Sequence, residues 1–491
     1  MKNRTILSLL LFATILASCG RTAVVREIAV VPEPLFVVEK EGSYTLGRGV
    51  AVAVTGLGQN EATVKYIMTS LRKAHLRPTL VGGADRADIS LVINDTLNPE
   101  LGDEGYLLEV QGNGILLSAN SPQGLLYAYQ TLAQLLPPDV TTSRYRHITL
   151  PACTLLDRPA YPWRGAHLDV CHHFFSTKFV KRYLDILAYY KLNRFVWHLA
   201  DSTVSRLPLS DGTQAEGRYS ADEIADVVAY ARDLSITVVP QLEVSDSLCH
   251  LLPEVAALFS SPYMVLLPLR DSDTITATLD TLVAHGKQLI GWRDGAVVAA
   301  PSDYCALQCY QADPRWQPAA IGGLITLEKS YQFNPCPPGT NRHLAARIVG
   351  GNAELWTDLI ATPGEAEYML LPRLLAIGEA LWSPADKRSW SRFRRKVEKE
   401  KERLTAAGIT YCEGSFTPRL TAQSTTAAGS EISITTEVPN TYIFYTTDGS
   451  TPTRNAKVYL GPIRLQHGTH LKILPVYNDR ERDTVYEFII R

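Results

Sequence analysis

Eight short apolar runs, separated by stretches with helical periodicity, fill the middle of the sequence and constrain its fold more than any other feature. They lie between about residues 154 and 408. Apolar runs that alternate with helical patterns indicate repeated βα units and a parallel sheet. The predicted strands are 164–170, 194–201, 236–244, 263–269, 287–292, 304–310, 322–327 and 348–356.

Two helices between these strands have clear signals. Ser220 and Glu223 form a capping box at the start of one helix. Another follows the first strand, where apolar residues recur at helical spacing: Phe179, Val180, Tyr183, Leu184 and Leu187. Eight strands over roughly 250 residues predict a (β/α)8 TIM-type barrel, whose chemistry sits at the carboxyl ends of the strands.

Different patterns flank the predicted barrel. Residues 22–150 mix strand-like runs with a helix at 124–136, and 106–119 has the alternation and Asn-Gly turn of a hairpin, so a small α+β domain is expected. Residues 413–491 contain strand-like runs separated by Gly, Pro, Asn and Asp turns. They predict a small all-β, sandwich-like domain.

The first residues have the pattern of a secretion signal. Lys2 and Arg4 precede an apolar stretch, 6–17, that is too short to span a membrane. The sequence LASC at 16–19, followed by glycine, resembles the bacterial lipobox, which implies that Cys19 carries a lipid anchor and that 1–19 form a lipoprotein signal. The expected location is the bacterial cell envelope, at the outer membrane or facing the periplasm; the alternative is an ordinary signal with a chance cysteine.

Charge and cysteine content exclude several classes of function. Lys and Arg number 48 against 50 Asp and Glu, so the formal charge is −2 and no basic surface for nucleic acid is indicated. A neutral substrate fits better, with membrane contact only through the anchor. The other seven cysteines are scattered and do not form a disulfide framework. Cys305 and Cys309 lack the further ligands of a zinc site, and no metal or cofactor is predicted.

Five stretches, in order, carry a resemblance to a known family: GLLYAYQTLAQLL, YPWRGAHLDVCHHFF, YYKLNRFVWHLAD, GGNAELWTDLI and LLPRLLAIGEALWSP. Together they resemble glycoside hydrolase family 20, the β-N-acetylhexosaminidases. The later tract YIFYTTDGSTPT resembles a C-terminal domain of some chitobiase-type members. The resemblance implies a partner glycan that contains an amino sugar, terminal N-acetylglucosamine or N-acetylgalactosamine, and hydrolysis with retention assisted by the sugar's own acetamide.

The resemblance also implies a set of sugar-binding positions. An arginine and a carboxylate bind hydroxyls, aromatic side chains enclose the ring, and an aspartate supports a histidine relay. In this chain the matching residues are Arg164, Asp201, Trp292, Tyr310, Tyr331, Trp356 and Asp358. The alternatives are a salt bridge for Arg164 and core packing for a lone aromatic residue.

The position of the catalytic pair is where the chain departs from the family. Aligned without a gap on the family's fourth strand, Leu269 stands for the aspartate that orients the acetamide and Arg270 for the glutamic acid that protonates the leaving oxygen. Arginine is not a proton donor at useful rates, because its pKa exceeds about 12. Ser247 stands in place of the relay histidine. No catalytic residue is assigned, and we expect hydrolysis to be lost or impaired.

Three readings of function therefore stay open. The chain is an amino-sugar-binding scaffold without hydrolysis, an active glycosidase that uses another carboxylate, or a structural envelope protein with a filled pocket. The candidate carboxylates of the second reading are Glu243, Asp271, Asp273 and Asp294. For the first reading we expect Arg270 to form an ion pair with Asp201 or Glu243, since a partly buried carboxylate needs a partner.

Overall fold

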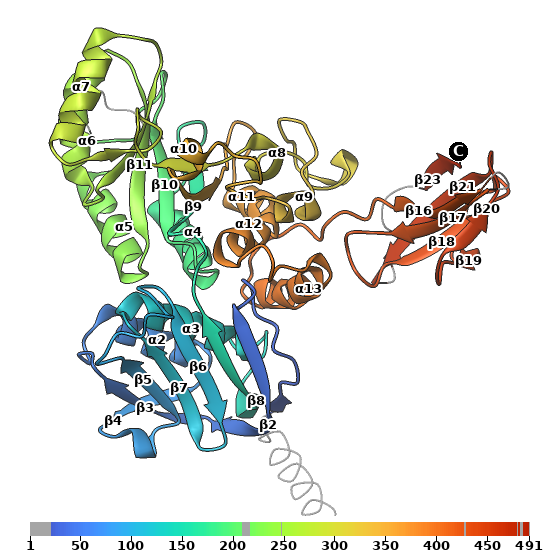
Figure 1. Cartoon of the computed structure of the whole chain (residues 1–491), viewed down its shortest axis with the longest axis horizontal. Helices are drawn as coiled ribbons and strands as arrows, with labels where there is room; N and C mark the ends of the chain where they lie inside the picture. The colour runs from blue at the N-terminus through green and yellow to red at the C-terminus, as the bar shows by residue number, and fades with distance from the viewer. Residues whose placement is uncertain are drawn as a thin grey trace, which may run out of the picture.

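The computed structural model describes residues 21–208, 217–246, 248–426, 429–478, 480–481 and 485–490. The predicted lipoprotein signal with Cys19, and Ser247, lie outside these residues. The chain forms three modules, and the C-terminal one stands apart on an extended segment (Figure 1). In the part of the chain that is described, no helix combines the length and the apolar character needed to cross a membrane.

The N-terminal module is an eight-stranded mixed sheet with the strand order β1-β8-β6-β7-β5-β3-β4, and β2 pairs with β8. Helices α2 (Ala62–Lys73) and α3 (Pro122–Leu135) contribute apolar side chains to its core. The predicted hairpin is formed by β6 and β7, and β8 continues past the predicted boundary at residue 150. The strands are β1 (Arg21–Val24), β2 (Phe36–Gly47), β3 (Gly49–Thr55), β4 (Arg77–Val81), β5 (Ile89–Ile93), β6 (Tyr106–Gln111), β7 (Gly114–Ala119) and β8 (Tyr145–Asp157).

The central module is a curled, seven-stranded sheet of TIM type, which confirms the predicted fold class. Its strand order is β13-β12-β11-β10-β9-β15-β14, and all neighbours are parallel. Every strand therefore ends at the same edge. The strands are β9 (Trp163–Asp169), β10 (Arg194–Ala200), β11 (Thr237–Val244), β12 (Tyr263–Pro268), β13 (Gln288–Leu289), β14 (Val297–Ala299) and β15 (Ile348–Ala353).

Helices cover the outer face of this sheet through a large apolar core. The predicted capping box is present, because the Ser220 hydroxyl accepts from the Glu223 N–H at 3.1 Å at the start of α5. The helices are α4 (Thr177–Tyr189), α5 (Ala221–Asp233), α6 (Leu252–Leu258), α7 (Asp273–Ala284), α8 (Ser302–Cys305), α9 (Leu327–Tyr331), α10 (Arg342–Ala345), α11 (Pro363–Leu370), α12 (Arg373–Trp382) and α13 (Trp390–Ala406).

Two of the predicted barrel strands are wrong. The segments 304–310 and 322–327 are short helices and turns. A single-residue bridge joins Ala306 to Glu354, just after β15, and another, between Tyr310 and Leu324, joins the two segments to each other. Gly322 and Gly323 have φ angles of 114° and 72°, which interrupt the extended backbone that a strand requires. The prediction also missed β14, a short strand that pairs with β15.

The C-terminal module is the predicted small all-β domain. A three-stranded sheet and a five-stranded sheet enclose a small apolar core. The three-stranded sheet has β16 (Arg419–Thr426), β17 (Gly429–Thr435) and β20 (Ile463–Leu465). The other sheet has β18 (Tyr442–Thr446), β19 (Lys457–Val458), β21 (His470–Tyr477), β22 (Arg480–Glu481) and β23 (Tyr486–Ile489).

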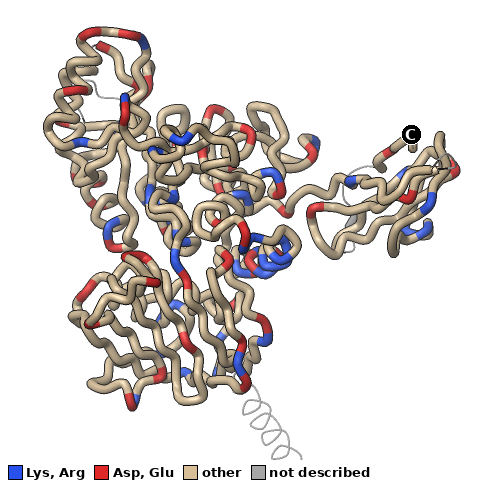
Figure 2. The backbone as a smooth tube through the Cα atoms, in the orientation of Figure 1, with Lys and Arg blue, Asp and Glu red and all other residues tan. Residues whose placement is uncertain are grey.

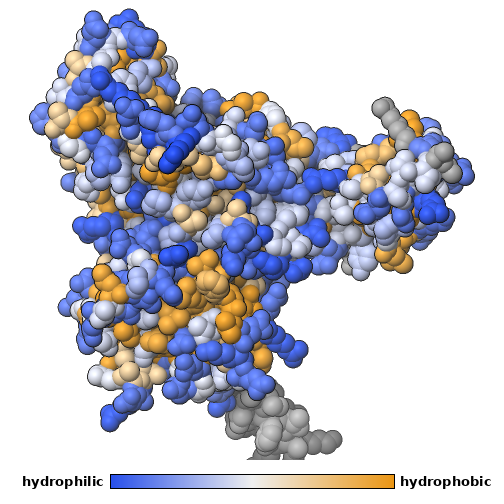
Figure 3. Space-filling view, in the orientation of Figure 1, coloured by the Kyte–Doolittle hydropathy of each residue, from blue (hydrophilic) through white to orange (hydrophobic). Residues whose placement is uncertain are grey.

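Charges of both signs are interspersed over the chain (Figure 2). Lys and Arg gather visibly on α13, where acidic residues are interleaved with them. In the face shown in Figure 3, hydrophobic residues are most concentrated on the N-terminal module, while the lobe that carries α6 and α7 is largely hydrophilic.

Candidate functional site

The inner face of the curled sheet changes from apolar to polar along the strands. Side chains alternate between the two faces of a strand, so every second residue points inward. Near the amino ends, Trp163, Val196 and Val239 form an apolar cluster. Further along the same strands the inward positions become polar. We call the ends of β9, β10, β11, β12 and β15 the carboxyl edge.

Four buried or nearly buried polar residues follow the apolar cluster, and we call them the inner polar cluster: His167, His198, Asn352 and Glu354. The Asn352 amide donates to Glu354 Oε1 at 2.6 Å, and His167 Nδ1 lies 3.6 Å from Glu354 Oε2. Burial raises the pKa of Glu354 to about 7 and lowers the pKa of His167 to about 3. Burial also lowers the pKa of His198. Both imidazoles are therefore neutral.

Trp356 lies next to the inner polar cluster, at the carboxyl end of β15. Its ring centroid is 4.6 Å from that of His167 and 5.0 Å from that of His198. The side chain is half-buried, so part of it reaches the solvent. An indole in this position can stack on a sugar ring.

A network of hydrogen bonds joins the end of β9 to the segment that follows β15. Asp169 accepts from His172 Nδ1 at 2.6 Å and from the N–H and hydroxyl of Thr357 at 3.0 and 2.9 Å. The second nitrogen of His172 lies 3.3 Å from Asp358. The pKa of His172 is raised overall. Partial burial alone would lower it, but the hydrogen bond to Asp169 and the nearby carboxylates have the larger effect. Both ring nitrogens face carboxylates, an arrangement that favours the protonated ring.

Two further carboxylates follow β10 and β11. Asp201 accepts from the Thr203 N–H at 2.6 Å and the Val204 N–H at 2.7 Å. Burial raises the pKa of Asp201, but these backbone hydrogen bonds outweigh it and the pKa is lowered. Glu243 accepts from the Ser202 N–H at 3.2 Å. The carboxyl edge is therefore rich in carboxylates. The other candidate carboxylates, Asp271, Asp273 and Asp294, are exposed outside this group.

Leu269 and Arg270 follow β12, and both side chains are exposed. Leu269 is 47% exposed, and the exposed Arg270 side chain forms an ion pair with Asp246. The predicted pairing of Arg270 with Asp201 or Glu243 is wrong. The reason is register: Pro268 pairs with Val244 across β12 and β11, so Arg270 and Asp246, each two residues further on, meet at the same level.

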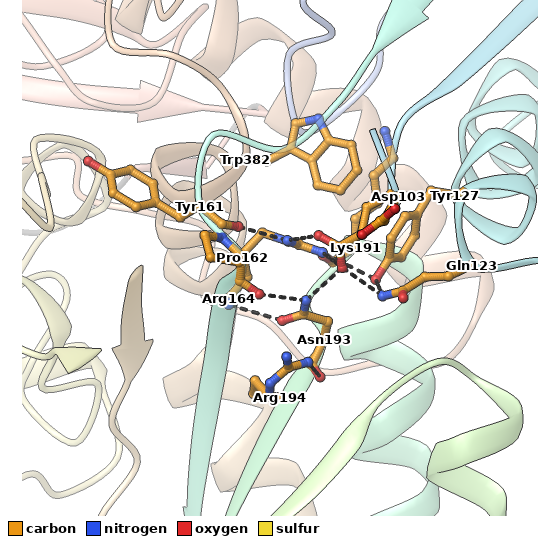
Figure 4. Close-up of polar contacts among 12 residues, drawn as sticks. Asp103, Gln123, Tyr127, Tyr161, Pro162, Arg164, Lys191, Asn193, Arg194 and Trp382 are labelled. Atoms are coloured by element: carbon orange, nitrogen blue, oxygen red, sulfur yellow. Dashed lines mark hydrogen bonds and ion pairs between the residues drawn. The ribbon is translucent and has the colours of Figure 1, made fainter. Parts of the chain in front are cut away.

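Arg164 is not part of the carboxyl edge, which corrects the prediction that it binds sugar. It lies at the amino end of β9, fully buried between the central and N-terminal modules (Figure 4). Its guanidinium donates to both oxygens of Glu104, at 2.7 and 3.1 Å, and to the hydroxyl of Tyr127 at 3.2 Å. Its Nε donates to the carbonyl of Lys191 at 2.9 Å. The salt-bridge alternative therefore holds, with Arg164 joining two modules.

The predicted aromatic set is not assembled around Trp356. The Tyr331 hydroxyl donates to Glu379 at 3.0 Å, and its ring stacks on Phe393 at 4.5 Å, so Tyr331 is a core residue. Trp292 follows β13 and donates to Asp280 of α7 at 3.4 Å. Tyr310 forms its single bridge with Leu324. Of the predicted sugar-binding residues, the structure places Trp356 and Asp358 after β15, and Asp201 after β10, which is separated from β15 by β9.

Two sets of side chains could hold a metal ion by composition. The potential ligand atoms of Asp169, Cys171 and His198, and those of Asp169, His172 and Asp358, lie within 4.8 Å of one another in each set. Asp169 belongs to both, and its oxygens already accept four hydrogen bonds, including one from the Cys171 N–H at 2.7 Å. Burial also raises the pKa of the Cys171 thiol, which opposes thiolate ligation. The geometry fits a hydrogen-bond network better than a metal centre.

A hollow of about 290 Å³ lies away from the carboxyl edge, between α9, α13 and the C-terminal module. Its charged groups are satisfied within the protein: Arg419 contacts Glu328 at 2.5 Å, Arg394 donates to the Thr436 carbonyl at 3.3 Å, and Glu437 accepts two backbone N–H groups. Among the described residues that line it, no buried polar side-chain atom lacks a partner. We regard it as a seam between modules.

Sequence reasoning missed the inner polar cluster and His172. A signal was present in the alternation of the strands. His167 on β9 and His198 on β10 occupy the same phase as the inward-pointing Trp163 and Val196. Asn352 on β15 and Glu354, directly after that strand, are likewise two residues apart. Polar residues at inward positions of a barrel strand indicate a site rather than a packed core.

Comparisons with known proteins agree with this architecture. The family profile described as "Glycosyl hydrolase family 20, domain 2" matches residues 27–158, and "Glycosyl hydrolase family 20, catalytic domain" matches 161–257 and 269–385. The profile "Fn3 associated" matches 432–490. The matched residues of the first two profiles leave out 258–268, which contain β12.

Several relatives are named as hexosaminidases. A beta-hexosaminidase of Porphyromonas gingivalis is 27% identical over 502 residues, covering 79% of this chain, and this chain spans 64% of that protein's length. A beta-hexosaminidase of Akkermansia muciniphila is 25% identical over 69% of this chain and 90% of its own length. The solved GH20 beta-N-acetylhexosaminidase of Streptomyces coelicolor has a TM-score of 0.71 at 24% identity, covering 78% of this chain and 97% of its own. This likeness shows the shared fold.

Proposed function

Because the chain belongs to glycoside hydrolase family 20, we propose that it binds glycans with terminal N-acetylglucosamine or N-acetylgalactosamine at the carboxyl edge, with hydrolysis lost or impaired. The observation that carries the proposal is the end of β12. The resemblance assigns Leu269 and Arg270 to the positions of the family's Asp-Glu pair; both side chains are exposed, and Arg270 is paired with Asp246.

Loss of activity follows from proton chemistry. A general acid must exchange a proton near neutral pH, and arginine keeps its proton. General acid catalysis contributes about 10²- to 10⁴-fold to a rate, and stabilisation of the reacting acetamide contributes further. Without both, turnover falls towards the uncatalysed rate.

Binding is supported by the residues at the end of β15. Trp356 offers a partly exposed indole, and the exposed carboxylate of Asp358 offers an acceptor for hydroxyl groups. A stacked ring and a few charge-assisted hydrogen bonds give weak affinity, millimolar to micromolar, or about 4 to 8 kcal/mol.

Two measurements on purified protein test the proposal. We expect no release of nitrophenol from a nitrophenyl β-N-acetylglucosaminide above background, and calorimetric binding of N-acetylglucosamine oligomers that Trp356→Ala removes. Trp292→Ala is the matched control, because Trp292 follows β13 and its indole contacts Asp280 of α7 rather than Trp356. Absence of binding at millimolar ligand contradicts the proposal.

A second candidate function is hydrolysis by another carboxylate. It is favoured by Glu243, which lies at the carboxyl edge within reach of the segment after β10. Turnover at an ordinary enzyme rate that Glu243→Gln abolishes and Asp294→Asn preserves would establish this candidate and refute the loss of hydrolysis.

We also propose that the protein is lipid-anchored in the bacterial cell envelope through Cys19. The support is the lipobox-like LASC at residues 16–19 behind a charged and apolar signal. We expect the full chain to partition into the detergent phase of an envelope extract, and Cys19→Ala to lose that partition. Equal partition of both proteins contradicts the anchor.

A further inference from the structure

Five exposed arginines gather at one end of the sheet in the N-terminal module, which we call the arginine end. The Arg21 side chain is 73% exposed and lies 3.9 Å from Asp139. Among the described residues, the guanidinium groups of the other four have no ion pair or hydrogen-bond partner. The arginine end therefore presents unpaired positive charge to its surroundings. Its members are Arg21, Arg48, Arg77, Arg144 and Arg146.

The register of the strands brings these residues together. Arg21, the first residue of β1, pairs with the first residue of β8, which lies between Arg144 and Arg146. The last residue of β2 pairs with the third residue of β8, so Arg48, which follows β2, also lies beside the start of β8. The Arg48 carbonyl accepts from the Arg77 N–H at 2.7 Å, which adds the start of β4. Because successive side chains of a strand point to opposite faces, the arginines surround this end of the sheet.

Two carboxylates lie at or beside the arginine end, and each has donors of its own. Asp139 accepts from the hydroxyls of Ser143 and Tyr145, at 2.6 and 2.5 Å. Asp88 accepts from the Tyr44 hydroxyl at 2.5 Å. Five guanidinium groups against two carboxylates leave an excess of three positive charges here, although the formal charge of the whole chain is −2. The charge distribution of the molecule is therefore uneven.

The arginine end is also where the predicted lipid anchor joins the fold. Cys19 precedes Arg21 by two residues in the sequence. Covalent geometry limits an extended chain to about 3.6 Å per residue, so Cys19 lies within about 7 Å of the first residue of β1. A lipid on Cys19 would therefore hold the arginine end at the membrane surface.

We propose that the arginine end binds the anionic phospholipid headgroups of the membrane that holds the anchor. The inference rests on the proposed lipid anchor and adds a second contact, whereas the sequence predicts membrane contact only through the anchor. A guanidinium group matches the geometry of a phosphate and binds it with two parallel hydrogen bonds. Each basic residue near an anionic membrane surface strengthens binding about fivefold.

This contact leaves the carboxyl edge free of the membrane. The N-terminal module adjoins the amino end of β9, where Arg164 forms its salt bridge with Glu104. The carboxyl edge lies at the opposite end of that strand, and Figure 1 shows the N-terminal module on one side of the central module. A protein held by the arginine end therefore offers the carboxyl edge to glycans beyond the membrane surface.

Vesicle sedimentation tests the inference with the full chain carrying Cys19→Ala, which cannot be acylated at that position. Its partition is measured into vesicles of phosphatidylcholine alone and into vesicles with about 30% phosphatidylglycerol, which supply anionic headgroups. We expect stronger partition into the anionic vesicles at low salt. The ratio of the two partition coefficients should fall towards one at about 0.5 M salt, because salt screens the charges.

Substitutions assign this ratio to the arginine end. Arg48→Gln combined with Arg146→Gln should lower the ratio at least about tenfold at low salt. Arg342→Gln combined with Arg395→Gln is the matched control, because it removes the same charge from exposed positions on α10 and α13. The control should leave the ratio nearly unchanged. Residues 1–19 are the same in all these chains, so their charges do not affect the comparison.

Two results would overturn the inference: equal partition into both kinds of vesicle, or a ratio that the Arg48 and Arg146 substitutions lower no more than the control does. If that double variant does not fold, Arg144→Gln replaces it, with an expected loss of about fivefold. The anchor is decided separately, by the detergent-phase partition of the acylated chain. The anchor can therefore hold while the arginine contact fails, and the two failures are distinguishable.

Discussion

Replacing Glu354 with glutamine should stabilise the protein at pH 8 and have much less effect at pH 5. Glu354 is held among the neutral imidazole of His167, the amide of Asn352 and the buried thiol of Cys305. Glutamine keeps the volume of the side chain and an oxygen that accepts from Asn352. The substitution removes the ionisation and changes little else.

The magnitude follows from the pKa. The pKa of Glu354 rises from 4.5 to about 7 on folding, chiefly because burial disfavours the carboxylate. The folded chain then binds more protons than the unfolded chain between these values, so the free energy of unfolding falls as pH rises from about 4.5 to about 7. Since one pKa unit corresponds to about 1.4 kcal/mol, the full cost is about 3 kcal/mol. Between pH 5 and pH 8 the wild-type chain should lose about 2 to 3 kcal/mol through this group.

Urea denaturation at pH 5 and pH 8, followed by tryptophan fluorescence, measures this difference. The free energy of unfolding of Glu354→Gln relative to the wild type should rise by about 2 to 3 kcal/mol from pH 5 to pH 8. Glu402→Gln, at an exposed position on α13, is the matched control and should show no such rise. A relative stability of the Glu354 variant that is the same at both pH values refutes the raised pKa and the argument built on it.

Three further substitutions test other parts of the structure. Arg164→Met should cost about 3 to 5 kcal/mol of unfolding free energy, because it leaves the carboxylate of Glu104 without its charge partner; urea denaturation should show that adding Glu104→Gln restores part of the loss. Gly350→Ala should prevent stable folding, since Gly350 has a φ of 149° and a Cβ atom there would lie 1.8 Å from the Trp163 carbonyl oxygen; soluble yield and circular dichroism measure this. Arg270→Glu should leave the thermal midpoint nearly unchanged, because the side chain is exposed, and should not restore hydrolysis of a nitrophenyl substrate. A rate that rises to an ordinary enzyme value in that variant contradicts the proposal.

The sequence located the long barrel strands because their pattern depends on neighbouring residues alone. Predicted strands at 164–170, 194–201, 236–244 and 263–269 correspond within a residue to β9, β10, β11 and β12. The prediction failed at 304–310. This segment has apolar periodicity, but it has no partner strand and forms only isolated bridges at Ala306 and Tyr310. Strand formation requires a partner, and a local pattern does not reveal whether one is present.

The candidate site was predicted in part for the same reason. Trp356 and Asp358 follow a strand with a clear pattern, and they lie at the carboxyl edge. Arg164 is only five residues before Asp169, the carboxyl end of β9, but it lies at the amino end of that strand. There it forms a salt bridge with Glu104 of the N-terminal module. Proximity in the sequence did not distinguish the two ends of one strand.

What the sequence by itself determined is the order of three modules, the family and the absence of a carboxyl group at Leu269 and Arg270, since these depend on residue identity and short-range periodicity. The tertiary structure decided the partners. The register of β11 and β12 places Arg270 beside Asp246, and the curl of the sheet brings His167, His198 and Glu354 together from three strand regions. Charge and hydrogen-bond energies depend on distances and on burial, and only the folded chain sets either.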